Sequence, residues 1–132
     1  MSNNYYENDP ALTSIIIGNG VTEIGHEAFY FQYKVTTLSI GNSVKVIGEE
    51  AFGYNSSLTS VVLSDSVEEL KKYAFTGCKF KTLHIGKSLN TIGSNALCSG
   101  ITSITVDSNN EYFVISDGDL YTKDLSERVY NV

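Results

Sequence analysis

A repeating unit of about 23 residues is the feature that most restricts the fold of this 132-residue chain. The units begin at Leu12, Val35, Leu58, Phe80 and Ile101, so successive starts are 23, 23, 22 and 21 residues apart. A fixed period of roughly 20 to 50 residues is typical of solenoids, in which each coil contacts only its neighbours. The sequence therefore predicts about five stacked coils over residues 12–106, within a single domain that spans residues 1–132.

The first part of each unit has alternating apolar residues, which indicate a short β-strand with one buried face. Two columns of the repeat alignment share this apolar character, three and five residues after each start. They are Ile15, Leu38, Val61, Leu83 and Ile104, and Ile17, Ile40, Leu63, Ile85 and Val106. Asn19, Asn42 and Asp65 follow and favour a turn. We expect one strand per coil and then a bend.

The second part of each unit returns to the core and closes on a small residue followed by a large one. Apolar columns beginning at Val21 and Ile24 mark the return, and Gly25 opens a second turn. The closing pairs are Ala28-Phe29, Ala51-Phe52, Ala74-Phe75 and Ala96-Leu97. We expect a short helical turn at each of these corners. The fold class is therefore a mainly β solenoid with short helical turns.

Both ends of the chain depart from the repeat, as expected for segments that cover the open ends of a solenoid. Residues 1–11 form a polar N-terminal flank, which contains Tyr5, Tyr6 and Pro10 and could lie over the first coil. Residues 107–132 contain alternating apolar positions around Asp117-Gly118, a hairpin turn signal. We expect a C-terminal cap made of a β-hairpin or a small β-meander.

The repeat resembles the BspA-like leucine-rich repeat, and the resemblance extends from Leu12 to Tyr130. That family's unit is similar to L-T-S-I-x-I-P-x-S-V-T-x-I-G-x-x-A-F-x-x-C. Its segments are matched by Leu58-Thr59-Ser60, Ser43-Val44, Ile47-Gly48 and Ala74-Phe75, with Cys78 three places further on. The family's closing hairpin is matched by Asp117, Gly118, Leu120 and Tyr121. Two departures are Gly in place of Pro after the strand and a Cys at the family position only at Cys78.

The resemblance implies a leucine-rich-repeat solenoid from a cell-surface or secreted protein that binds other proteins. Host proteins, matrix proteins or proteins of other cells are the expected partners, through repeat surfaces, as in an adhesion module. No catalytic residues are implied. The first residues lack the basic start and apolar stretch of a signal peptide. A cytoplasmic scaffold for protein-protein interaction is therefore the alternative that the sequence leaves open.

Charge and motif content argue against nucleic-acid binding, membrane insertion and catalysis. The chain has 9 Lys and Arg residues against 15 Asp and Glu residues, a net charge of -6 that would repel phosphate backbones. It has no run of about 18 apolar residues. His26 and His84 fall at different repeat positions, so they do not suggest a catalytic constellation. We expect no enzymatic activity and no cofactor.

Neither the acidic turn after the last repeat nor the cysteines predict a metal site or a disulfide. Asp107, Asn109 and Glu111 have the oxygen spacing that begins a calcium loop, but the Gly and bidentate Glu of an EF-hand are missing. We interpret them as a turn cluster. Cys78 and Cys98 fall in adjacent coils, but disulfide geometry is demanding. Because Cys78 resembles a buried family position, we expect two free thiols.

Two surfaces are candidates for partner binding. Side chains alternate across a strand, so residues next to the buried pair must point outward. This strand face consists of Ile16, Ser39, Val62, His84 and Thr105, flanked by Ser14, Thr37, Ser60, Thr82 and Ser103. Its Ser and Thr residues are also ordinary strand ladder partners, whereas solvent-facing Ile16 and Val62 favour a binding role. The alternative site consists of the loop aromatics Tyr30, Phe31, Tyr33 and Tyr54, which either anchor a partner or pack on one another.

Overall fold

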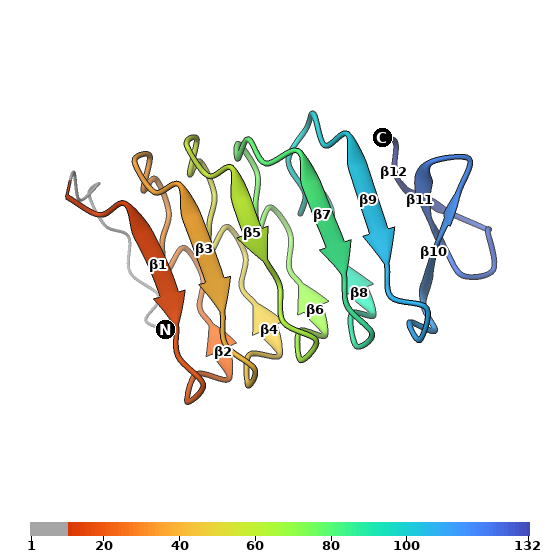
Figure 1. Ribbon diagram of the computed structural model, residues 1–132, viewed down its shortest axis with the longest axis horizontal. Helices are drawn as coiled ribbons and strands as arrows, with labels where there is room; N and C mark the ends of the chain where they lie inside the picture. The colour runs from red at the N-terminus through yellow and green to blue at the C-terminus, as the bar shows by residue number, and fades with distance from the viewer. Residues whose placement is uncertain (1–10) are drawn as a thin grey trace.

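The computed structural model of the protein describes residues 11–132 and shows a β-solenoid closed by a small sheet (Figure 1). The predicted contribution of Tyr5, Tyr6 and Pro10 lies outside the described residues. On one face of the solenoid, called the first face below, the first strand of each coil lies beside the first strand of the next coil. These strands are β1 (Ser14–Ile17), β3 (Thr37–Ile40), β5 (Ser60–Val62), β7 (Thr82–Ile85) and β9 (Ser103–Val106). The predicted repeat solenoid, with one such strand per unit, is confirmed.

A second, shorter strand runs along the other side of each complete coil. These strands are β2 (Glu23–Ile24), β4 (Val46–Ile47), β6 (Glu69–Leu70) and β8 (Thr91–Ile92), and they form one parallel four-stranded sheet. Sequence analysis assigned these residues to the core but not to strands. The structure thus contains four complete coils and the first strand of a fifth, so the prediction of about five coils is close but one coil is incomplete.

Equivalent residues of successive units pair with each other on both faces of the solenoid. Ile15 pairs with Leu38 on the first face, and Ile47 pairs with Leu70 in the second sheet. The first face is divided into the sheets β1-β3-β5 and β7-β9. The division follows the third unit, which is one residue shorter than the two before it. The repeat register derived from the sequence is therefore the pairing register of the strands.

The corners differ from the predicted helical turns, because no helix is present in residues 11–132. Each corner begins as a single turn, in which the Ala28 amide donates to the Gly25 carbonyl at 3.2 Å. The residue before each corner alanine has a left-handed backbone, with φ of 55° at Glu27 and 56° at Glu50. A right-handed helix cannot continue through such a residue. The next amide instead pairs with the following coil, as from Phe29 to the Ala51 carbonyl at 2.8 Å.

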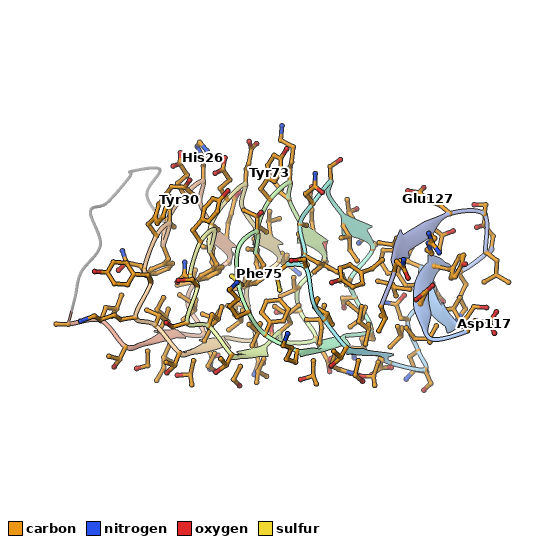
Figure 2. All side chains as sticks on the ribbon, turned by 90° about the horizontal axis from the view of Figure 1, so that it is seen from above. His26, Tyr30, Tyr73, Phe75, Asp117 and Glu127 are labelled. Atoms are coloured by element: carbon orange, nitrogen blue, oxygen red, sulfur yellow. The ribbon has the colours of Figure 1, made fainter. Side chains whose placement is uncertain are left out.

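The apolar columns of the repeat form one continuous core. Ile24, Ile47 and Leu70 are fully buried, and the corner alanines are at most 4% exposed. The corner rings stack on one another, with 5.4 Å between the centroids of Phe29 and Phe52 and 5.4 Å between those of Phe52 and Phe75. Figure 2 shows Phe75 in the interior of the stack. Each coil therefore supplies one wall for its neighbour's apolar side chains.

A further buried column lies just beyond the corners and has mixed chemistry. Its members are Gln32, Asn55, Cys78 and Cys98, each at most 4% exposed. Asn55 Nδ2 donates to the carbonyls of Phe29 at 2.8 Å and Phe52 at 3.0 Å. Cys78 Sγ donates to the same Phe52 carbonyl at 3.2 Å, and both cysteines are free thiols. The column thus ties the corner backbones of adjacent coils together, and the expectation of two free thiols is confirmed.

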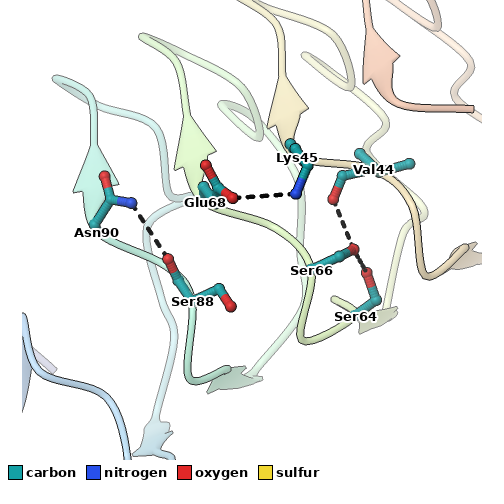
Figure 3. A network of polar contacts seen from close by, with 7 residues as sticks. All are labelled: Val44, Lys45, Ser64, Ser66, Glu68, Ser88 and Asn90. Carbon is teal, nitrogen blue, oxygen red and sulfur yellow. Dashed lines mark hydrogen bonds and ion pairs between the residues drawn. The ribbon is translucent and has the colours of Figure 1, made fainter.

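Polar contacts also connect successive coils on the turn between the two sheets (Figure 3). Ser66 Oγ donates to the Val44 carbonyl at 2.7 Å and lies 2.7 Å from Ser64 Oγ. Lys45 Nζ lies 3.3 Å from Glu68 Oε2 in an exposed ion pair. Such pairs contribute about 0 to 1 kcal/mol, so the hydroxyl contacts to backbone carbonyls are the more specific links in this turn.

The predicted C-terminal meander is confirmed and docks on the last coil. It consists of the antiparallel strands β10 (Phe113–Ser116), β11 (Asp119–Thr122) and β12 (Arg128–Tyr130). Asn110 anchors it, because buried Nδ2 donates to the Gly86 carbonyl at 2.8 Å and Oδ1 accepts from the Phe113 amide at 2.9 Å. The Tyr130 hydroxyl donates to the Cys98 carbonyl at 2.7 Å. Sequence analysis did not identify Asn110 as this anchor.

The close approach of coils at Gly41 gives a first test of the fold. A Cβ at this position would lie 2.6 Å from the Ile17 carbonyl oxygen, which belongs to the preceding coil. We expect Gly41→Ala to lower the free energy of unfolding by about 1 to 3 kcal/mol, measured by urea denaturation. Gly18→Ala is the matched control, because a Cβ there meets no described atom within 4 Å. Equal losses in the two variants would contradict the coil spacing.

The buried thiols give a second test, in which alkaline pH is the variable. Burial raises the pKa of Cys78 to about 12 and that of Cys98 to about 11, from 9.0. Because the folded pKa values are raised, the stability that these neutral thiols contribute is complete below pH 9 and is lost as the pH rises through 11 and 12. Removing both thiols as Cys78→Ala plus Cys98→Ala should make thermal stability fall less steeply over this range.

The same thiols should be unreactive in the folded protein. A thiol reagent at pH 8 attacks the thiolate, so we expect slow labelling of the native chain and rapid labelling of two groups in denaturant. Fast labelling of the native chain, or a Cys78-Cys98 disulfide peptide recovered after non-reducing digestion, would contradict the structure.

Candidate functional site

The strand face has the orientation that alternation predicts. All ten of its side chains are exposed across the first strands of the five units. Ile16 is 80% exposed and Val62 is 63% exposed, whereas Ile15 and Ile17 on the opposite side of the same strand are 6% exposed. Each large apolar side chain thus lies in solvent beside hydroxyl groups.

The strand face also differs from the rest of the chain in charge. Seven of its ten residues are Ser or Thr, and none is Asp, Glu, Lys or Arg, although the chain carries a net charge of -6. Its histidine, His84, shares a hydrogen bond of 2.7 Å between Nδ1 and Thr105 Oγ1. Ile16 and Val62 both lie in the β1-β3-β5 sheet, whereas His84 lies in the β7-β9 sheet. The apolar part of this neutral surface is therefore concentrated on the first three strands.

Figure 2 shows Tyr30, one of the loop aromatics, on the side of the solenoid away from the strand face. Phe31 stacks on Tyr54 with 5.1 Å between ring centroids, and Tyr30 contacts both rings edge-on. Tyr33 is 44% exposed. The structure brings together three of the four predicted aromatics, and these three pack on one another.

Glycines of the next coil make room for two of these rings. A Cβ at Gly53 would lie 3.0 Å from Tyr30 Cδ1, and one at Gly77 would lie 2.6 Å from Tyr54 Cδ1. Tyr54 itself has φ of 57°, in the left-handed region that disfavours side chains. Gly77 occupies the equivalent place in the next unit with φ of 75°. The rings are therefore held in fixed positions, part-covered and with Phe31 and Tyr54 still over 40% exposed.

Acidic side chains border this aromatic cluster. A pocket of about 300 Å³ is lined by Tyr30, Glu50, Tyr54, Tyr73 and Thr76. The pKa of Tyr30 is raised, first by partial burial and then by the negative charge of Glu50. The corner side of the solenoid therefore combines aromatic rings with carboxylates, in contrast to the uncharged strand face.

The acidic turn after the last repeat has the structure that we predicted. Asp107 Oδ1 accepts a hydrogen bond from the Asn109 amide at 2.8 Å, the geometry of the turn cluster that we predicted.

A different group brings three potential metal ligands together in the described part of the chain. It consists of His26, Glu49 and Glu50. Sequence analysis missed it, although the repeat register places His26 and Glu49 at the same position of successive units.

The repeat is also found in known proteins. A family model for the BspA type leucine-rich repeat region matches residues 1–113 with six copies of the repeat. Comparison with curated protein sequences gives no match. No helix in residues 11–132 is long and apolar enough to cross a membrane.

Solved structures of bacterial proteins share the fold. The pneumococcal vaccine antigen PcpA has a TM-score of 0.67 and 23% identity over 90% of this chain and 38% of that one. A leucine-rich cell surface protein from Faecalibacterium prausnitzii A2-165 has a TM-score of 0.60 and 26% identity over 85% of this chain and 43% of that one. A leucine-rich repeat protein from Eubacterium ventriosum ATCC 27560 has a TM-score of 0.59 and 24% identity over 85% of this chain and 36% of that one.

This chain spans less than half of the length of each of these solved chains. The six-copy match, the paired repeat strands and the shared solenoid agree with one another. The protein therefore belongs to the BspA-type leucine-rich-repeat family.

Proposed function

We propose that this chain is a protein-binding module that recognises its partner through the strand face and serves adhesion or recognition at the cell surface. The observation that carries the proposal is the exposure of Ile16 and Val62, at 80% and 63%, within a row of hydroxyl side chains. Repeat solenoids of this kind are interaction modules, and catalysis is not their typical role. Binding is accordingly the function that we assign.

The chemistry of the strand face suits contact with another protein. Burying a side chain such as Ile or Val contributes roughly 1.5 to 3 kcal/mol, and protein interfaces surround such anchors with groups that form hydrogen bonds. Strands spaced by about 4.8 Å place five side chains of one column along a ladder of roughly 20 Å. The absence of full charges on the ten residues means that docking there desolvates no ion pair.

The surface location rests on similarity to a surface protein. The Faecalibacterium prausnitzii chain, at 26% identity, is a leucine-rich cell surface protein. Host or extracellular-matrix proteins, or proteins on other cells, are therefore the partners that we propose. Intracellular scaffolding is the alternative that the experiments below distinguish.

A binding assay on immobilised matrix proteins and on host cells tests the strand face. We expect Ile16→Glu plus Val62→Glu to weaken binding at least about tenfold, because two apolar anchors are replaced by charges and 1.4 kcal/mol corresponds to a factor of ten. Surface plasmon resonance on the matrix proteins gives the affinity. Thermal melting checks that the variant folds, which we expect because both side chains are exposed.

The matched control places the same two charges elsewhere. Leu125 and Val132 are also exposed, at 55% and 40%, but belong to the C-terminal cap. Leu125→Glu plus Val132→Glu should therefore bind like the parent chain. Unchanged binding by the strand-face variant, together with loss in a Tyr30→Ala plus Tyr54→Ala variant, would assign the site to the loop aromatics instead.

The proposed location has its own test in the organism that makes the protein. Antibodies raised against this chain should label intact cells, and protease added outside the cells should remove the label. Recovery of the protein only in the cytoplasmic fraction would contradict the surface proposal and favour an intracellular scaffold.

A further inference from the structure

Three potential metal ligands converge where the first and second coils turn after β2 and β4. The ligand atoms of His26, Glu49 and Glu50 all lie within 4.8 Å of one another. His26 and Glu49 occupy the same place in successive units, and Glu27 and Glu50 occupy the next one. Stacking of the coils thus brings together side chains that are 23 or 24 residues apart.

Backbone hydrogen bonds hold this part of the two coils together. The Glu27 amide donates to the Glu49 carbonyl at 3.0 Å, and the Glu50 amide donates to the Lys72 carbonyl at 3.2 Å. The positions of the three side chains are therefore set by paired backbone rather than by a free loop. Figure 2 shows His26 on the side away from the strand face, so the group is separate from the surface proposed for partner binding.

The carboxylates around His26 are incompletely neutralised. Glu27 Oε1 lies 3.1 Å from His26 Nε2, and Glu49 Oε1 lies 4.0 Å from Lys72 Nζ, with both partners of the second pair exposed. Within residues 11–132, Glu50 forms no ion pair. An exposed pair at 4.0 Å is weak, so a cation of higher charge can displace the lysine.

We propose that His26, Glu49 and Glu50 bind a divalent transition metal ion, with Zn²⁺ as the first choice. Mg²⁺ and Ca²⁺ prefer oxygen ligands alone, whereas imidazole favours zinc and its neighbours in the first transition row. Zinc binds His nitrogen and carboxylate oxygen at about 2.0 to 2.2 Å, so bound ligand atoms are roughly 3.4 Å apart in a tetrahedron. The ligand atoms of the three side chains already lie within 4.8 Å of one another, so small side-chain rotations bring them to this separation.

Glu27 is suited to this site whichever ring nitrogen of His26 binds the ion. When Nε2 donates to Glu27, Nδ1 keeps the lone pair that a metal requires, and a carboxylate on the second nitrogen is the common support of a metal-bound histidine. When Nε2 binds the ion instead, Glu27 Oε1, which lies 3.1 Å from Nε2, is the carboxylate oxygen beside the bound nitrogen. The bound ion joins the first coil to the second and raises the stability of the folded chain by mass action.

Zinc titration of the chelator-treated protein tests the site. We expect one Zn²⁺ per chain by calorimetry, a rise in the melting temperature with ZnCl₂, and a visible absorption band with CoCl₂. CaCl₂ and MgCl₂ should bind far more weakly. Because loss of a supporting residue alone weakens metal binding by about 10- to 100-fold, His26→Ala should weaken zinc binding by at least about a hundredfold.

The chain offers a matched control, because His84 is its only other histidine. His84→Ala should leave zinc affinity unchanged, whereas Glu49→Gln and Glu50→Gln should each weaken it by at least about tenfold. Lys72→Gln should strengthen binding, since it removes the cation that competes for Glu49. Without zinc, all these variants should melt like the parent, because the substituted side chains lie at the surface.

Three results would overturn the proposal. They are no saturable zinc binding by the parent chain, binding that survives His26→Ala, and binding that His84→Ala or removal of both cysteines abolishes. Loss of zinc binding in His84→Ala would place the ion on the strand face, which contains His84. In every case the proposed partner-binding function is judged separately, by the binding assay with Ile16→Glu plus Val62→Glu.

Discussion

Backbone hydrogen bonds between successive coils are the interaction on which the rest of the structure depends. They run along both faces of the solenoid, with a break on the first face between β5 and β7, and through the corners. This pairing sets a separation at which a Cβ on Gly41 or Gly48 would lie 2.6 Å from a carbonyl oxygen of the preceding coil. Glycine is required there by the neighbouring backbone and not by the local turn.

Because coils pair in register, a residue's neighbours in space are the residues at the same position of adjacent units. Chemical character therefore extends along columns and differs between the sides of the solenoid. The strand column is uncharged and partly apolar, whereas the corner columns carry His26, Glu49 and Glu50 beside aromatic rings. One sequence period thus produces two chemically distinct surfaces, on opposite sides of a single core.

The two candidate sites were not equally accessible to prediction. The strand face follows from local alternation, since Ile16 must point outward if Ile15 and Ile17 point inward. The group of potential metal ligands, His26, Glu49 and Glu50, lies at corners where the backbone is left-handed at Glu27 and Glu50. Repeat spacing does not reveal this backbone conformation. The mutual packing of Tyr30 and Tyr54 likewise depends on glycines that belong to the following coil. A side chain's partner across coils is visible only when both backbones are placed.

The sequence by itself determined the repeat register, the family, the first strand of each unit, the buried apolar columns and the capping meander. These features follow from periodicity, which is a local property of the chain. Tertiary structure alone decided the second strands, the corners without helix in residues 11–132, and the anchoring of the cap by Asn110. It also decided the buried place of Gln32 and Asn55. In the second strands, at the corners and at Asn55 and Asn110, polar groups find partners on a neighbouring coil or on the cap. The conformation there is fixed by contacts that no single unit contains.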